Sequence, residues 1–277
     1  MASKKSPEER IEAYKRIVPG MSDSHFHSEV MQEKNVGLRA TLDALAAEEA
    51  SWLIDISIRP GSLQLRRRLC NSYRLVRFTS GIHPGSAAKG PLEEMLQEME
   101  RELQEPEVVG AGEMGLDWVK MRASRDEQER AFREQLRLAN RHNKPVIIHN
   151  READREIYRI LKEIPPVAGG IMHCFSSGPE SAEKALELGF HLSFAGNLTY
   201  PSGSEAIQES CRLVPPNRLL LETDAPFLAP QPVRGRPNSP AYVGHTYDFV
   251  SKLRGEPLDE LVSSVGGNLA SLFGLLD

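Results

Sequence analysis

The sequence has few cysteines and few aromatic residues, and it lacks a long hydrophobic run. Its three cysteines, Cys70, Cys174 and Cys211, are far apart and odd in number, which argues against a disulfide framework and against a thiolate zinc site. No stretch approaches the ~18 apolar residues of a membrane span, and the charged opening segment has no signal-peptide core. We therefore expect a cytoplasmic protein with reduced thiols and no membrane association.

An excess of positive charge is also missing. The formal net charge is -5, which argues against a protein that coats nucleic acid with a broad basic face. It leaves room for a local phosphate site, because bound cations change the local sign of the charge. The 40% hydrophobic and 26% charged residues are typical of a globular chain that buries a large core.

Short β-type runs alternate along the chain with longer segments of helical periodicity. Eight such runs in about 250 residues predict a (β/α)8 barrel, the TIM barrel, in one α/β domain with extra C-terminal helices. We expect the strands at 21–27, 51–57, 74–83, 107–113, 144–150, 168–175, 190–196 and 218–225.

Two segments fall outside this pattern. Residues 1–20 form an N-terminal extension with a helical "PEERIEAYKRI", so that the barrel domain spans 21–277. The proline-rich stretch 229–242 is short enough to be a long loop after the last strand. We expect that loop over the mouth of the barrel.

Polar residues gather at the predicted strand ends, where a (β/α)8 barrel carries its chemistry. Each residue alone fits an ordinary structural role, but seven of them converge on one rim: His25, His27, His83, Glu113, His149, His173 and Asp224. Side chains two apart on a strand share a face, so His25 and His27 point to the barrel axis while Phe26 packs outward.

Carboxylates buried at these strand ends without matching cations would repel each other and lose hydration, at a cost of several kcal/mol. Divalent metal ions would remove this conflict. Four histidines with Glu113 and Asp224 can supply two ions, and Glu113 could bridge them because a carboxylate has two oxygens.

The motifs resemble the TatD family of metal-dependent deoxyribonucleases, within the amidohydrolase-like barrels. The resemblance rests on "DSHFH", "GIHP", "GEMGLDW", "KPVIIHNREA", "HCFSSG", "LLLETDAPFLAP" and "NLASLF" in this order. It implies that one metal ion is held by His25, His27 and Asp224, the other by His149 and His173, with Glu113 bridging them.

The resemblance further implies that Arg151 and His83 face the substrate phosphate, where a guanidinium fork suits phosphate oxygens. We expect Asp224 to accept the proton of the attacking water and Arg151 to stabilise the developing negative charge. The chain departs from the family at Asn150, where a serine is common, and at "TYP" (199–201), where a lysine is common.

Three further residues have weaker signals. Glu222 could accept a hydrogen bond from a metal-binding histidine or serve the barrel core. Trp118 could stack a nucleobase or pack in its loop. We expect Cys174, next to His173, to face the helices as a core residue.

The activity implied is hydrolysis of DNA phosphodiester bonds from the 3′ end, with two divalent ions (Mg, Mn or Zn) and a preference for single strands or frayed ends. The alternatives are a related barrel hydrolase acting on a small amide, lactone or phosphate ester, and a metal-binding scaffold without catalysis. The sequence leaves the oligomeric state and the choice between DNA and RNA open.

Overall fold

The computed structural model describes residues 5–70 and 73–275 and contains one sheet of eight parallel strands in sequential order, β1 to β8. A bridge between Phe26 and Ala225 links the first strand to the segment after the last one. The predicted TIM barrel is therefore confirmed. The strands are Asp23–Phe26 (β1), Leu53–Asp55 (β2), Val76–Ser80 (β3), Val108–Asp117 (β4), Val146–Arg151 (β5), Gly170–Met172 (β6), His191–Phe194 (β7) and Leu219–Leu221 (β8).

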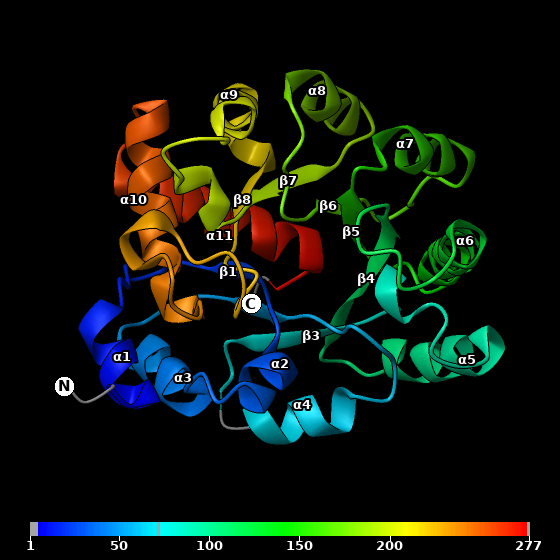
Figure 1. The fold of residues 1–277 in the computed structure, drawn as a ribbon, viewed down its shortest axis with the longest axis horizontal. Helices are drawn as coiled ribbons and strands as arrows, with labels where there is room; N and C mark the ends of the chain where they lie inside the picture. Colours follow the sequence, from blue (N-terminus) through cyan, green and yellow to red (C-terminus); the bar gives the residue numbers. More distant parts are fainter. Residues whose placement is uncertain (1–4, 71–72, 276–277) are drawn as a thin grey trace.

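Most of the helices surround the sheet as an outer ring, whereas the last helix crosses the middle of the view (Figure 1). The apolar faces of the helices pack against the strands. Strand β4, for example, is buried along its entire length. The helices are Pro7–Tyr14 (α1), Ser28–Glu33 (α2), Leu38–Ala47 (α3), Leu63–Cys70 (α4), Leu92–Leu103 (α5), Arg125–Arg141 (α6), Asp154–Glu163 (α7), Pro179–Glu187 (α8), Glu205–Leu213 (α9), Val243–Arg254 (α10) and Leu258–Phe273 (α11). Within the described residues, no helix is long and apolar enough to cross a membrane.

Several strands are shorter than the sequence predicts. His27 follows β1 and caps α2, while His83 follows β3 and caps a 3-10 turn. Asp224 lies three residues past β8 with a left-handed φ of 53°. Strand β4 is longer than the sequence predicts, because it continues to Asp117 rather than ending at 113.

The N-terminal extension, of which residues 1–4 lie outside the described residues, packs against the C-terminal part of the barrel. Ile11 of α1 is buried, and Arg16 forms an ion pair of 2.7 Å with Asp248 of α10. The hydroxyl of Tyr242, which ends the proline-rich loop, donates to the carbonyl of Arg10. The predicted barrel domain ends with residues 276 and 277, which also lie outside the described residues.

The proline-rich loop is tied to the segment that carries Asp224. The side-chain amide of Asn238 donates to the carbonyl of Thr223 at 2.8 Å, and its backbone N–H donates to the carbonyl of Pro226 at 3.0 Å. Asn238 is fully buried. The loop therefore fixes the backbone on both sides of Asp224.

Replacing Gly115 by alanine is expected to destabilise the barrel by about 2–4 kcal/mol. Gly115 of β4 has a φ of 141°, and an added Cβ would collide with the carbonyl oxygen of His149 on β5. Urea unfolding measures the loss. The control is Gly267→Ala in α11, where nothing lies within 4 Å of the added Cβ; it should be neutral or slightly stabilising. Equal stability of the two variants would contradict the prediction.

Candidate metal centre

Glu113 lies at the centre of the polar cluster in the barrel mouth. The register of β4 against β5 shifts between Gly112 and Met114, so that Glu113 is an extra residue in its strand. A bulge of this kind re-aims the side chain of the inserted residue. The side chain of Glu113 is only 3% exposed, and its two oxygens face two different sets of imidazoles.

The first set surrounds Oε2 of Glu113. His25 Nε2 is 3.6 Å from this oxygen, and His27 Nε2 is 3.9 Å from it. Asp224 Oδ1 is 3.8 Å from His25 Nε2 and 3.3 Å from His27 Nε2. Three of the predicted ligands therefore meet on one side of Glu113.

The second set surrounds Oε1 of Glu113. His149 Nδ1 is 2.6 Å from this oxygen, and His173 Nε2 is 3.0 Å from it. The two imidazole nitrogens are 3.2 Å apart. All six predicted ligands are thus gathered in one cluster, with Glu113 between the two sets.

His83 also reaches this cluster. Its Nε2 is 3.7 Å from Glu113 Oε1, and its ring centroid is 4.7 Å from that of His149. Its Nδ1 accepts a hydrogen bond from the N–H of Gly85 at 2.8 Å. Because a neutral imidazole carries one hydrogen, that hydrogen is on Nε2, which points into the cluster as a donor.

The carboxylates are ionised in this setting. Burial opposes the charge of Glu113, yet the charge of His173 and the hydrogen bond from His149 lower its pKa well below the ordinary value. Burial also opposes the charge of Asp224, and His27 and His25 lower its pKa.

The pKa values of the histidines are shifted in opposite directions. Burial lowers the pKa of His83 to about 3. Burial and the neighbouring His173 lower the pKa of His25. His173 itself is buried, but Glu113 and Glu222 raise its pKa well above the ordinary value. The cluster therefore combines neutral imidazoles with a site that attracts positive charge.

The donor set fits divalent cations. His27 Nδ1 hydrogen-bonds the carbonyl of Ile56, so the Nε2 lone pair points inward, where it lies 3.2 Å from His25 Nε2. Such a nitrogen pair beside carboxylates needs a proton or a cation between its members. The buried Nδ1 of His25 has no hydrogen-bond partner among the described residues. Among the described residues, three groups have metal-ligand spacing: His25, His27 and Glu113; His83, Glu113 and His149; and His25, His173 and Glu222, which joins the two sets.

Two buried aspartates that the sequence analysis missed hold the first set in place. Asp23 Oδ1 accepts from the N–H groups of His25 and Thr223, and Oδ2 accepts from the Thr223 hydroxyl at 2.6 Å. Burial raises the pKa of Asp23 to about 7. Asp55 accepts from the N–H and the hydroxyl of Ser28, the residue after His27. In the sequence, both could be recognised as acidic residues within predicted strands, in "DSH" and "LID".

Asp117 is a further residue of the centre that the sequence analysis missed. Its Oδ2 is 3.5 Å from His149 Nε2, a contact without hydrogen-bond geometry, since that nitrogen is unpartnered among the described residues. Burial opposes its ionisation, but the contact with His149 and two backbone N–H donors lower its pKa. Asp117 lies beyond the predicted end of the fourth strand, so it was not among the polar residues at the predicted strand ends.

Two buried glutamines of α6 fix the loops that carry His83 and Asp117. Gln135 accepts from the N–H of Ile82 at 2.7 Å and donates to the carbonyl of the same residue. Gln128 accepts from the N–H of Asp117 at 2.9 Å. The two glutamines are seven residues apart, which is two helical turns, and this spacing on the apolar face was the available signal.

Arg151 ends β5, two residues after His149, and its side chain is exposed at the rim. The positive charge of Arg151 partly offsets the raised pKa of the Cys174 thiol. Asn150 is turned to its own loop instead, where its amide donates to Asp154 Oδ1 at 3.2 Å.

The expectation for Cys174 is wrong. Strand β6 ends at Met172, so the alternation of faces no longer applies, and Cys174 adopts a left-handed φ of 45°. The residue is half-buried, and burial together with the charges of Asp224 and Glu222 raises the pKa of its thiol well above the ordinary value. Cys174 is therefore a partly exposed residue next to the polar cluster, to which its backbone N–H is bonded through Glu222, and not a core residue.

Glu222 and Trp118 have distinct settings. Glu222 Oε1 is 3.3 Å from His173 Nδ1 and accepts from the N–H of Cys174 at 2.9 Å. Trp118 packs against the core, with the guanidinium of Arg125 4.7 Å from its ring centroid. The indole is therefore largely covered by protein.

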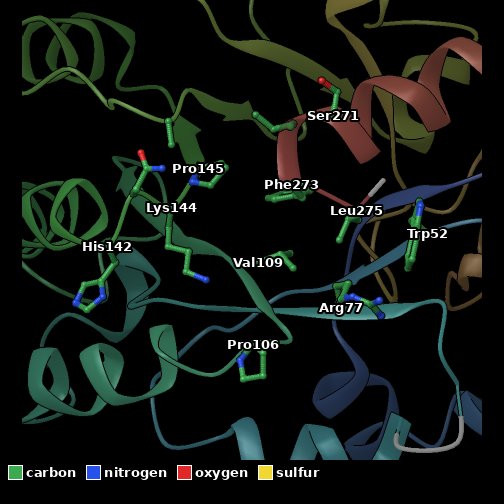
Figure 2. A pocket seen from close by; sticks show the side chains of 14 residues that line it. Trp52, Arg77, Pro106, Val109, His142, Lys144, Pro145, Ser271, Phe273 and Leu275 are labelled. Carbon is green, nitrogen blue, oxygen red and sulfur yellow. The ribbon is translucent and has the colours of Figure 1, made fainter. Parts of the chain in front are cut away.

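A cavity of about 640 Å³ lies at the opposite end of the barrel (Figure 2). Its lining includes Trp52 and Lys144, which precede β2 and β5, and Phe273 at the end of α11. The ammonium of Lys144 already donates to the carbonyl of Val108. Since the cavity faces the end where the strands begin, it is separate from the cluster around Glu113.

Sequence comparisons give the relatives of the chain. A family model described as TatD related DNase matches residues 22–274. The chain is 32% identical over 252 residues to the uncharacterized metal-dependent hydrolase YabD of Bacillus subtilis, covering 91% of this chain and 98% of the relative. It is 36% identical over 202 residues to the 3′-5′ ssDNA/RNA exonuclease TatD of Pantoea vagans, covering 71% and 77% of the two chains.

Solved structures give the same result for the fold. The crystal structure of YjjV, a TatD homologue from Escherichia coli, superposes with a TM-score of 0.85 at 28% sequence identity. The superposition covers 93% of this chain and 99% of that chain.

Proposed function

Because the chain belongs to the family of TatD-related DNases, and is therefore a metal-dependent hydrolase, we propose that it shortens DNA from the 3′ end by hydrolysing phosphodiester bonds. One observation carries the proposal: the two oxygens of Glu113 face two separate sets of imidazoles at the barrel mouth. Two cations held by one bridging carboxylate are the arrangement that stabilises both the attacking and the leaving oxygen of a phosphodiester.

We assign the ligands of the two ions from these contacts. One ion would be held by His25, His27 and Asp224, the other by His149 and His173, and Glu113 would be shared. Bound there, the ions would polarise the phosphoryl group and lower the pKa of the attacking water. Imidazole ligands favour zinc or manganese, whereas carboxylates also suit magnesium, so all three ions are candidates.

The protein side chains have separate tasks in this scheme. Asp224 accepts the proton of the attacking water, because its side chain is 15% exposed and reaches solvent, while that of Glu113 is only 3% exposed. His83 donates its Nε2 hydrogen to a phosphoryl oxygen. Arg151 stabilises the negative charge that develops on the phosphoryl group from the exposed rim.

The shape of the site favours a single strand. The six ligand side chains lie inside the mouth of a barrel and are at most about one-sixth exposed. A duplex end would have to fray before its phosphates could reach them. We therefore propose single-stranded DNA or frayed ends as the substrate.

The test uses metal-stripped protein reloaded with Mg²⁺, Mn²⁺ or Zn²⁺ and a 5′-labelled single-stranded oligonucleotide. We expect stepwise shortening that needs added metal, slower cutting of a blunt duplex, and a higher Tm with metal because the ions bind only the folded chain. A 3′-labelled strand should release its label first.

Two outcomes would contradict the proposal. Equal rates on blunt duplex and single strand would exclude the requirement for fraying. A protein that binds two ions and gains thermal stability but leaves every oligonucleotide intact would point to a small ester or amide as the substrate.

A further inference from the structure

An exposed aromatic ring lies on the loop that carries Asp224. The N–H of Phe227 donates to the carbonyl of Asp224 at 2.8 Å, and the preceding Pro226 accepts a hydrogen bond from the buried Asn238. The backbone is thus held at Phe227 and at the residue before it, yet the Phe227 side chain is 40% exposed. An aromatic side chain on a fixed backbone loses little conformational freedom when a flat ligand packs on it.

The ring borders the metal centre. Its centroid is 6.3 Å from that of His27, with the two planes inclined at 70°. The ammonium of Lys34 lies over the Phe227 ring, 4.4 Å from its centroid, so a flat ligand can stack only where this ammonium does not cover the ring. Lys34 is exposed at the end of α2, the helix that begins directly after His27. An aromatic surface and a cation therefore come from the same two segments that carry His27 and Asp224.

This surface differs from the other exposed apolar side chains. Within the described part of the chain, the large apolar residues with high exposure are Leu65, Val119, Met121, Val167 and Phe227. Phe227 is the aromatic member, and it adjoins the ligand cluster. Trp118, the stacking candidate from the sequence, is less exposed because its ring packs against the core.

We propose that Phe227 is the stacking surface for a nucleobase that directly flanks the scissile phosphate, and that Lys34 contacts a phosphate of the same strand. The inference rests on the proposed function, since it takes a polynucleotide as the substrate. A base and its phosphate are separated by one sugar, so a phosphate among the ligands places a flanking base at the rim of the cluster. Stacking on an aromatic ring accepts every base, which suits stepwise removal of nucleotides.

The experiment compares four substrates: an intact single-stranded oligonucleotide, strands with an abasic residue at the 3′-terminal or at the penultimate position, and a strand with both. For the wild type, we expect kcat/KM to fall about 5- to 100-fold on at least one singly abasic strand, the range that one base–aromatic stack supplies. Phe227→Leu should cut the intact strand as slowly as the wild type cuts that abasic strand. Its kcat/KM should not change when the base is removed. Phe227→Tyr should restore the wild-type pattern.

Controls separate stacking from damage to the centre. On the doubly abasic strand, Phe227→Leu and the wild type should react equally, and both should bind the same number of metal ions. Val167→Ala, on an exposed side chain before β6, should change nothing. Lys34→Gln should lower kcat/KM for all four substrates by the same factor. It should also reduce the slope of log(kcat/KM) against log[salt] by about 0.7.

If Phe227→Leu still discriminates against abasic strands as the wild type does, the stacking role is wrong while the nuclease stands. Loss of metal from Phe227→Leu would also overturn it, because the ring would then support the centre itself. If the wild type cuts none of the strands, the proposed function fails and this inference fails with it.

Discussion

Glu113→Gln is expected to reduce kcat/KM on single-stranded DNA by roughly 10³-fold or more, which corresponds to at least about 4 kcal/mol of transition-state stabilisation. The substitution keeps the shape of the side chain but removes its charge and replaces one acceptor oxygen with a donor NH₂ group. Because each oxygen of Glu113 faces a different set of imidazoles, one set must meet this amide group. The protein should therefore lose metal as well as activity.

The measurement pairs steady-state kinetics with the metal content of the purified variant. Glu222→Gln should have a smaller effect, because Glu222 contacts His173 on the side away from Glu113. Loss of such a supporting contact lowers activity by about 10- to 100-fold. Glu29→Gln is the control, since this buried glutamate pairs with Arg59 instead. A Glu113→Gln protein that retains two ions and reacts within tenfold of the wild type would refute the bridging role.

The architecture could be predicted from the sequence because it depends on a repeated pattern. Eight alternations of β-type and helical runs leave few other folds, and the order of strands along the sheet follows from them. The exact strand ends could not be predicted, since they depend on hydrogen bonds between neighbouring strands. Strand β6 keeps only three residues, so that Cys174 lies outside the alternation of the strand and is partly exposed rather than in the core.

The convergence of the polar residues was predictable for a related reason. Parallel strands end at one rim, so residues at those ends meet whatever the precise boundaries. The supporting residues were less visible. Asp23 and Gln135 act through hydrogen bonds to residues that are distant in sequence, and Asp117 acts through its contact with His149. A sequence shows such a residue only as a polar side chain in an apolar segment.

Asp224→Asn is expected to lower kcat by about 10²- to 10⁴-fold, the range for removal of a general base, with a smaller change in KM. Asparagine keeps an oxygen that can face His27 and His25 but cannot accept the proton of water at neutral pH. The lowered pKa of Asp224 keeps the wild-type carboxylate ionised and available for that step. Kinetics with saturating metal, together with direct metal analysis, tests the prediction.

Asp117→Asn is the matched comparison because Asp117 contacts His149 from outside the ligand set. It should lower activity only about 10- to 100-fold, and added metal should restore part of the loss. For Asp224→Asn, which also loses a carboxylate ligand, added metal should refill the site without restoring activity, because the proton acceptor is gone. If the activity of Asp224→Asn instead rises with metal concentration toward that of the wild type, Asp224 only holds the ion, and the proton must leave through another group.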